Sequence, residues 1–322
     1  MRGAAAIPDD FARAVVRRYG ETGRAWLDAL PATLATCAGR WRVEIGPPFA
    51  PLTRNYVAAA RREGGERVVL KAHAPDGGGA NEAAALALFG GRGGVRLREY
   101  DPERAVLLIE RCDPGTRLRD VSATDDERAV EIACATIRRL RQPPPAGHRF
   151  PAMGDWNAAL HRLRPYYGGG TGPFPAALIA EVERLLPELT ASAPAPTLLH
   201  GDLHHDNILA AGDGWRAIDP KGLIGDPAYE VAAMLYNPLP DLLRAPDPAR
   251  VLARRVAGFA VGLDLDRGRV RGWGIVRATL SAWWSAEAGG AVWAEALTCA
   301  ELLRGIGPEM IGAQESSAPD GA

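Results

Sequence analysis

A polar segment between two apolar runs contains residue types that can do chemistry. It extends from His200 to Asn207 and is flanked by Leu198-Leu199 and Ile208-Leu209. A charge-rich loop held between apolar elements is typical of a functional site on a rigid base. Asp202 can accept a proton from a hydroxyl group or orient it. Asn207, five residues later, can offer its side-chain oxygen to a metal ion.

A second oxygen ligand follows after a turn. The strand-like stretch Trp215–Ile218 ends at Asp219, whose carboxylate is the kind of hard ligand that Mg²⁺ prefers. Phosphoryl transfer requires a base near the acceptor oxygen and metal ions that bridge the phosphates. We therefore predict that Asp202 is the catalytic residue and that Asn207 and Asp219 hold the metal.

The same loop is also compatible with a metal-dependent hydrolase. His200, His204, His205 and Asp206 carry imidazole and carboxylate groups, which suit zinc. Their order, H-x-D-x-H-H-D, differs from the usual H-x-H-x-D-H of such sites, and Asn207 would have no role. A metal-dependent hydrolase is therefore a distant alternative to an enzyme of phosphoryl transfer.

Composition bounds the remaining classes of function. The chain has 322 residues, 47% of them hydrophobic, and a net charge of -1, which does not favour nucleic acid as a partner. No stretch is apolar enough for a signal peptide or a membrane span. The four cysteines are scattered without a CxxC pair. They indicate buried thiols in a reducing compartment, so we expect a cytoplasmic protein.

The elements that must position these residues differ between the two parts of the chain. Residues 9–40 read as helical, and Asp76 to Gly79 as a Gly-rich loop before a helix at 80–89. Alternating or β-branched apolar residues predict strands at 42–46, 55–61, 66–73, 95–100 and 105–111, with a hairpin turn at 63–66. After residue 125 the pattern is almost entirely helical, apart from a hairpin-like stretch at 207–219. The sequence predicts an α+β protein.

The motifs resemble those of a known family. His200-Gly-Asp-Leu-His-x-x-Asn207, followed by Ile218-Asp219-Pro220, resembles the catalytic and metal-binding signature of the aminoglycoside phosphotransferases. The continuation from Pro220 to Ala232 is similar to the streptomycin 6-phosphotransferase and hydroxyurea phosphotransferase branch. The resemblance runs in order from about residue 42 to 303.

This resemblance implies a two-lobed, protein-kinase-like fold. A small antiparallel β-sheet lobe with one key helix would occupy residues 1–112, and a larger, mainly helical lobe residues 113–312. We expect the small, polar segment 313–322 to be disordered.

The resemblance also implies the cofactors ATP and Mg²⁺ and their contacts. Lys71, in the stretch Val68–Ala72, would bind the ATP phosphates, and Glu82 on the next helix would pair with it. Backbone groups of Glu110 and Cys112 would read the edge of adenine. A partner-binding kinase fold without activity would be expected to have lost one of four residues, all of which are present: Lys71, Asp202, Asn207 and Asp219.

Departures from the family pattern lie in the loops. The segment Gly46–Asn55 should cover the phosphates but lacks the G-x-G-x-x-G of protein kinases, with Thr53 and Asn55 as its candidate phosphate contacts. His205 is an additional imidazole without an assigned role. Glu230 stands where related sequences often have Asp, and we expect it to anchor the catalytic loop.

Three charged residues are the candidate contacts for the acceptor. Of the 38 basic residues only Lys71 and Lys221 are lysines, which singles out Lys221 as a candidate contact for phosphate or substrate. Asp226 and Glu287 could bind a cationic guanidino or amino group. That charge would favour an aminocyclitol over uncharged hydroxyurea or another small metabolite.

The residues and the resemblance together predict an ATP-dependent kinase for a small hydroxylated molecule. The first candidate acceptor is a streptomycin-type aminoglycoside, and the kinase would then confer antibiotic resistance. The expected assembly is a monomer or a weak homodimer. Most tryptophans of the C-terminal helices are expected in the core.

Overall fold

The computed structural model describes residues 7–75, 78–212 and 214–307, which fold into two compact units. One unit comprises Met1–Gly115 and Ala210–Lys221, and the other comprises Thr116–Leu209 and Gly222–Ala322. The segment 210–221, which the sequence analysis assigned to the helical lobe, therefore groups with the first unit. The tail at 313–322 and part of the predicted Gly-rich loop, residues 76–77, lie outside the described residues.

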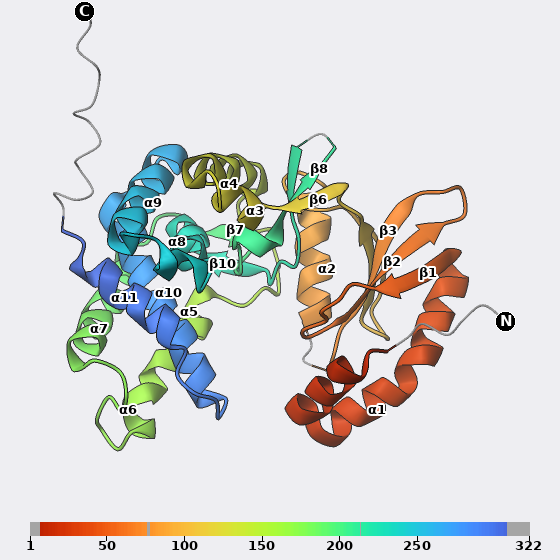
Figure 1. The fold of residues 1–322 in the computed structure, drawn as a ribbon, viewed down its shortest axis with the longest axis horizontal. Coiled ribbons are helices and arrows are strands. Elements are labelled where there is room, and N and C mark those ends of the chain that lie inside the picture. The colour runs from red at the N-terminus through yellow and green to blue at the C-terminus, as the bar shows by residue number, and fades with distance from the viewer. Residues whose placement is uncertain (1–6, 76–77, 213, 308–322) are drawn as a thin grey trace, which may run out of the picture. The chain divides into compact units, whose positions relative to one another are not determined.

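The first unit is built on a five-stranded antiparallel sheet with two helices (Figure 1). Its strand order is β1-β2-β3-β5-β4. In chain order its elements are α1 (Asp9–Trp41), β1 (Val43–Pro48), β2 (Tyr56–Arg62), β3 (Arg67–Ala72), α2 (Gly78–Phe89), β4 (Leu97–Asp101) and β5 (Val106–Glu110). The predicted succession of three strands, a helix and two strands is confirmed.

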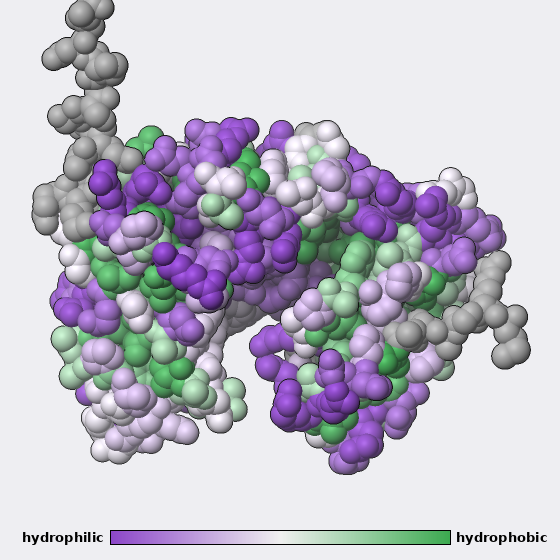
Figure 2. Space-filling view, viewed as in Figure 1, coloured by the Kyte–Doolittle hydropathy of each residue, from purple (hydrophilic) through white to green (hydrophobic). Residues whose placement is uncertain are grey.

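The turn between β2 and β3 forms the predicted hairpin. The Arg62 amide donates to the Glu66 carbonyl, and the Gly65 amide donates back to Arg62. Gly64 and Gly65 have φ values of 97° and 93°, a left-handed conformation that glycine adopts without steric cost. Figure 2 shows hydrophilic residues gathered around this end of the two strands.

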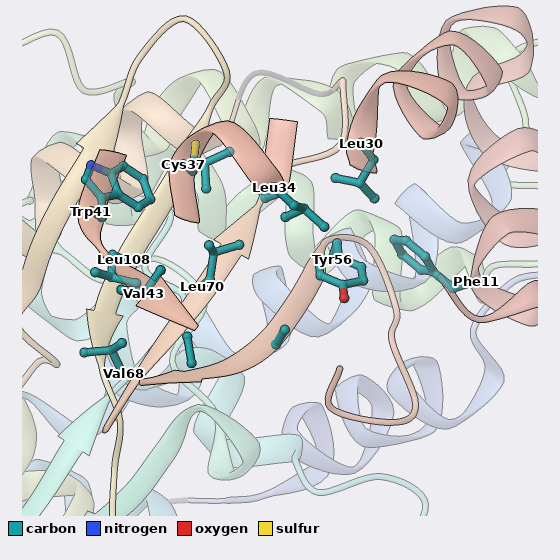
Figure 3. Packing of buried hydrophobic residues seen from close by; sticks show 14 of the residues in the cluster. Phe11, Leu30, Leu34, Cys37, Trp41, Val43, Tyr56, Val68, Leu70 and Leu108 are labelled. Carbon is teal, nitrogen blue, oxygen red and sulfur yellow. The ribbon is translucent and has the colours of Figure 1, made fainter. Parts of the chain in front are cut away.

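Helix α1 covers one face of the sheet and supplies much of its core (Figure 3). Leu30 and Leu34 pack against Tyr56 and Leu70, and all four side chains are almost completely buried. Each buried side chain of this size stabilises the fold by roughly 1.5–3 kcal/mol. The helix is interrupted at Gly20, where φ is 58°, whereas Pro31 lies within a continuous helical segment and starts no new helix.

Strand β3 directs alternate side chains to opposite faces of the sheet, as any β-strand does. Val68 and Leu70 face α1, whereas Val69 belongs to the cluster that Leu86 of α2 forms on the other face. By the same alternation Lys71 lies on the α2 face. The strand thus places a cation opposite the helix that carries Glu82.

The second unit is mainly helical, as predicted (Figure 1). Helix α10 packs against α7, α8, α9 and α11. The longer elements are α4 (Asp126–Leu140), α7 (Ala176–Ala191), α9 (Pro248–Leu263), α10 (Arg267–Glu287) and α11 (Ala294–Gly305). The shorter helices are α3 (Leu118–Ser122), α5 (Met153–Asn157), α6 (Leu163–Tyr166) and α8 (Ala232–Tyr236), with 3-10 turns at Ala158–Arg162, His205–Asn207, Pro227–Val231 and Asp241–Arg244.

Short strands accompany these helices. The predicted hairpin at 207–219 is present as β8 (Ile208–Ala211) and β9 (Gly214–Ala217), and β6 (Pro114–Arg117) spans the first crossing between the units. Strands β7 (Thr197–Leu199) and β10 (Leu223–Gly225) were not predicted, and they pair in antiparallel fashion, with Leu199 opposite Leu223. The loop that begins at His200 therefore starts from a fixed strand end.

Candidate active site

Lys71 lies at the centre of a buried cluster of charges in the first unit. Its ammonium group donates to Oε2 of Glu82 at 2.6 Å and to Oδ1 of Asp219. Lys71 is 5% exposed and Glu82 is 2% exposed. The predicted pairing of Lys71 with Glu82 is confirmed, whereas its contact with ATP stays a prediction.

The charges of this cluster stabilise one another. Burial on its own would lower the pKa of Lys71, but the carboxylates of Glu82 and Asp219 outweigh it and raise that pKa. Burial likewise acts to raise the pKa of Asp219, and the ammonium groups of Lys71 and Lys221 lower it far below the ordinary value. Both groups are therefore ionised at neutral pH.

His73 also belongs to this cluster, and the sequence analysis did not identify it. Its Nε2 lies 2.9 Å from Oε2 of Glu82, and the imidazole is 5% exposed. The signal was available, because His73 is two residues after Lys71, which is the spacing that places side chains on one face of a strand.

Asp219 reaches this cluster because its segment joins the first unit. The Ala217 amide donates to the Gly93 carbonyl at 2.7 Å, and the Val95 amide donates to the Ala217 carbonyl at 2.9 Å. Asp219 then takes a left-handed conformation with φ of 64°, which an aspartate tolerates better than most residues. Lys221 donates to Oδ2 of Asp219 at 3.0 Å.

The predicted adenine contacts lie at the end of β5. The Glu110 amide donates to the Arg96 carbonyl at 2.9 Å, and the Glu110 carboxylate accepts from the Arg96 amide. Burial raises the pKa of the Cys112 thiol to about 11, so it stays protonated at neutral pH.

In the loop before β2, the Asn55 side chain accepts a hydrogen bond from the Ala74 amide at 3.1 Å and so ties that loop to the end of β3. Contacts of these residues with a nucleotide stay predictions.

The loop that follows β7 is anchored by Glu230, as predicted. The Glu230 carboxylate accepts from the amides of His200 at 2.6 Å and of Gly201 at 3.2 Å. Gly201 has a φ of 83°, and a Cβ atom there would lie 2.9 Å from the Leu223 side chain, so glycine is required. Burial raises the pKa of Glu230 to about 7, although the two amides act in the opposite direction.

The imidazoles of the loop shape its backbone. The Asp202 amide donates to Nδ1 of His200, and the Asp206 amide donates to Nδ1 of His204, each at 3.3 Å. His205 is 1% exposed, and neither of its ring nitrogens has a hydrogen-bond partner within the described part of the chain. Burial lowers the pKa of His205 well below its ordinary value, so the ring is neutral.

Asn207 is held close to Asp202 by the same loop. Its Nδ2 donates to the Asp202 backbone carbonyl at 2.9 Å and lies 3.2 Å from Nε2 of His204. These contacts engage the amide nitrogen, so the side-chain oxygen is the atom suited to a cation.

The predicted metal ligands each have chemistry that fits magnesium. Asn207 in the second unit offers an amide oxygen and Asp219 in the first an ionised carboxylate, the hard ligands that Mg²⁺ takes beside phosphates and water. Their joint role in holding the ion stays a prediction. In residues 7–75, 78–212 and 214–307, no group of three or more His, Cys, Asp or Glu side chains is arranged to hold a metal ion.

A buried arginine that the sequence analysis missed contacts Asp202. Nη2 of Arg277 donates to Oδ1 of Asp202 at 3.3 Å, and Nη1 donates to Oγ of Ser281 at 3.1 Å. The guanidinium also lies over the rings of Trp156 and Trp284. No local signal distinguishes Arg277 from the many other arginines of the chain.

The three predicted acceptor contacts have protein partners in the structure. The Asp226 carboxylate is 2% exposed and accepts from Nε1 of Trp273 at 2.6 Å and from Arg269. Glu287 is more exposed and forms a two-point pair with Arg162, at 2.6 and 2.9 Å. Lys221 contacts Asp219, as described above. Binding of an acceptor by these residues stays a prediction.

The expected core role of the tryptophans is confirmed for two of them. Trp273 and Trp283 are completely buried, whereas Trp284 and Trp293 are partly exposed.

Within the described residues, no helix combines the length and the apolar character needed to cross a membrane.

Comparison with known proteins identifies the family. The family model described as "Aminoglycoside/hydroxyurea antibiotic resistance kinase" matches residues 43–289. A streptomycin 6-kinase from Streptomyces glaucescens is 33% identical over 303 residues, which cover 93% of this chain and 97% of that protein. A hydroxyurea phosphotransferase from Kitasatospora aureofaciens is 32% identical over 287 residues, covering 88% of this chain and 81% of that protein.

The fold is also found among solved structures. A choline/ethanolamine kinase family protein from Mesorhizobium loti superposes with a TM-score of 0.61 at 17% identity, covering 88% of this chain and 96% of that one. The antiparallel sheet unit and the helical unit are thus those of a kinase-like fold. The chain belongs to the aminoglycoside/hydroxyurea antibiotic resistance kinase family and is a kinase that acts on a hydroxyl group.

Proposed function

We propose that this kinase transfers the γ-phosphate of ATP to a hydroxyl group of a streptomycin-type aminoglycoside and thereby inactivates the antibiotic. The proposed identity of the acceptor rests on the 33% sequence identity to a streptomycin 6-kinase over almost the whole chain. The buried pair of Lys71 and Glu82, with Asp219 on the same ammonium group, supports ATP as the donor, because phosphates need a fixed cation.

The residues take separate roles in the proposed reaction. Lys71 orients the α- and β-phosphates, and Glu82 holds its ammonium group in place. Asp202 positions the acceptor hydroxyl and takes up its proton. Asn207 and Asp219 would hold Mg²⁺, which would neutralise charge on the phosphates.

Positioning should contribute more than basicity. A loose transition state for phosphoryl transfer requires little proton abstraction, so general-base catalysis adds roughly 10²- to 10⁴-fold. The larger part of the rate enhancement then comes from holding the hydroxyl and the phosphate in line. We assign reading of adenine to backbone groups of Glu110 and Cys112.

Hydroxyurea is the second candidate acceptor, because the Kitasatospora aureofaciens relative is a hydroxyurea phosphotransferase. The two candidate acceptors differ in charge, because streptomycin is cationic and hydroxyurea is neutral. We assign acceptor contacts to Lys221 and to Glu287, which lies at the partly exposed end of α10. The Glu287 carboxylate suits a guanidino group.

We further propose a monomer or weak homodimer in the cytoplasm, where ATP is present and the four free cysteines stay reduced.

One assay tests the reaction and the acceptor together. Consumption of ATP is measured with streptomycin, other aminoglycosides, hydroxyurea, simple sugars and amino alcohols, and the product is identified by its added phosphate. Asp202→Ala should abolish turnover and leave ATP binding nearly unchanged. Turnover of that variant at the wild-type rate would refute the role of Asp202. No ATP consumption with any acceptor, together with bound zinc, would instead favour a hydrolase.

A further inference from the structure

The carboxylate of Asp202 lies against a cation that is fixed independently of it. Arg277 is 5% exposed, and its Nη2 donates to Oδ1 of Asp202 at 3.3 Å. The remainder of the guanidinium is held by Ser281 and by the faces of two indoles, Trp284 at 4.9 Å and Trp156 at 5.7 Å from the ring centroids.

The arrangement follows from the spacing on one helix. Ser281 and Trp284 lie four and seven residues after Arg277 on α10, so the three side chains share a face. Trp156 comes from α5, and its ring meets Trp284 edge to face at 5.5 Å. Stacking on aromatic faces and donation from a rigid fork are properties of arginine that lysine lacks.

Burial indicates which partner orients the other. The Arg277 side chain is 6% exposed, whereas that of Asp202 is 31% exposed and lies on a loop. The helix and the two indoles fix the guanidinium, and the carboxylate then adapts to it.

We propose that Arg277 is a positioning residue for the transfer reaction, which orients the carboxylate of Asp202 toward the acceptor hydroxyl and offsets its negative charge. The proposal rests on the function proposed above, in which Asp202 contacts that hydroxyl. It makes α10 part of the catalytic apparatus as well as the core of the second unit.

Removal of Arg277 should lower kcat and should also lower the KM for a cationic acceptor. A misplaced Asp202 lowers kcat by roughly 10²-fold. The same change leaves a negative charge without its neighbouring cation, so a cationic acceptor such as streptomycin should bind more tightly and its KM should fall. Hydroxyurea is neutral, so its KM should stay close to the wild-type value.

The experiment compares three variants of the full-length chain. Arg277→Met removes the cation and the fork, and Arg277→Lys restores the charge alone. Arg255→Met is the matched control, because Arg255 is 2% exposed in the same unit and pairs with Asp126 instead, at 2.6 Å. Steady-state kcat and KM are measured with ATP and streptomycin, then with ATP and hydroxyurea, and the folded fraction is followed by circular dichroism.

The expected result is a low kcat without a raised streptomycin KM for Arg277→Met, and an intermediate kcat for Arg277→Lys. Arg255→Met should melt at lower temperature but keep its kcat per folded molecule. Combined with Asp202→Asn, Arg277→Met should cause no further loss of residual turnover, since the arginine acts through that carboxylate. If Arg277→Met does not fold, Arg277→Lys decides the question by the same kcat criterion.

Two outcomes would overturn the proposal. One is a wild-type kcat in a folded Arg277 variant, and the other is a further loss in the double variant that is as large as in the single one. Failure of the proposed function looks different, because the wild-type chain would then phosphorylate neither acceptor. Activity with hydroxyurea alone would change the acceptor and leave the test of Arg277 intact.

Discussion

Lys221 donates to Oδ2 of Asp219 at 3.0 Å, on the carboxylate oxygen that Lys71 does not contact. The only two lysines of the chain therefore meet at one carboxylate. Their side chains differ in exposure, 30% for Lys221 and 7% for Lys71. Of the two lysines, Lys221 is therefore the one that we expect to be displaced by the divalent ion that Asp219 is proposed to hold.

We therefore predict that Lys221→Met binds ATP at lower magnesium concentrations than the wild-type chain. A partly exposed ion pair contributes about 0.2–1 kcal/mol, so the half-saturating magnesium concentration should fall about 1.4- to 5-fold. Isothermal titration of ATP at a series of magnesium concentrations measures it. Lys221→Arg, which keeps the charge, is the control, and a higher magnesium requirement of the methionine variant would show that Lys221 assists nucleotide binding instead.

The buried cluster around Lys71 should be sensitive to the loss of one charge. Lys71→Met leaves the carboxylate of Glu82 buried without its ammonium partner, which should lower the free energy of unfolding by about 3–5 kcal/mol and abolish ATP binding. Urea denaturation gives the first value and titration calorimetry the second. The exposed pair of Arg164 and Glu183 provides the comparison, and Arg164→Met should leave both quantities unchanged.

Glu230 should make the stability of the chain depend on pH. Burial raises its pKa to about 7 from an ordinary value of 4.5, so the folded chain binds a proton that the unfolded chain has released. The stability this contributes is complete below about pH 4.5 and is lost as the pH rises through about 7, with a total of roughly 3 kcal/mol.

Glu230→Gln lacks this titration. Its free energy of unfolding, compared with that of the wild-type chain between about pH 5 and pH 8, should reveal a wild-type advantage that shrinks as the pH rises. The amide also turns a donor toward one of the two backbone N–H groups, so the variant should be less stable by about 1–3 kcal/mol. An advantage that is the same at both pH values would contradict the assignment.

Neutralising Asp226 and neutralising Glu287 should have different effects on stability and on acceptor binding. Asp226→Asn removes the charged partner of Arg269 inside the second unit, which should lower stability by a few kcal/mol and leave the acceptor KM of the folded enzyme unchanged. Glu287→Gln should raise the KM for a cationic acceptor with little effect on stability. Thermal unfolding and acceptor kinetics distinguish the two, and a raised KM for Asp226→Asn would instead support its predicted acceptor role.

Local patterns were sufficient to predict the strands and helices of the sheet unit, and the family resemblance predicted its ion pair. The alternation along β3 and the helix that follows bring Lys71 to Glu82 within 11 residues of chain. The anchor at Glu230 was predicted from its place in a family motif. In both cases residue type and order carry the information.

Contacts between distant segments were not predictable in this way. Asp202 and Arg277 are 75 residues apart, and nothing in the sequence of α10 distinguishes that arginine from Arg269 or Arg271. The grouping of residues 210–221 with the first unit depends on the bridge between Gly94 and Ala217, a pairing without a local signature. Such contacts arise from packing and not from propensity.

The scarcity of lysine makes Asp219 accessible to protein chemistry. Apart from the terminal amine, an amine-reactive reagent has two side chains to modify, and both contact this carboxylate. Modification of Lys221, read by mass spectrometry of its peptide, should therefore report whether that ammonium group is paired with Asp219 or released. The chain would thus contain, without any engineered label, a chemical reporter of the state of the carboxylate that we propose to hold Mg²⁺.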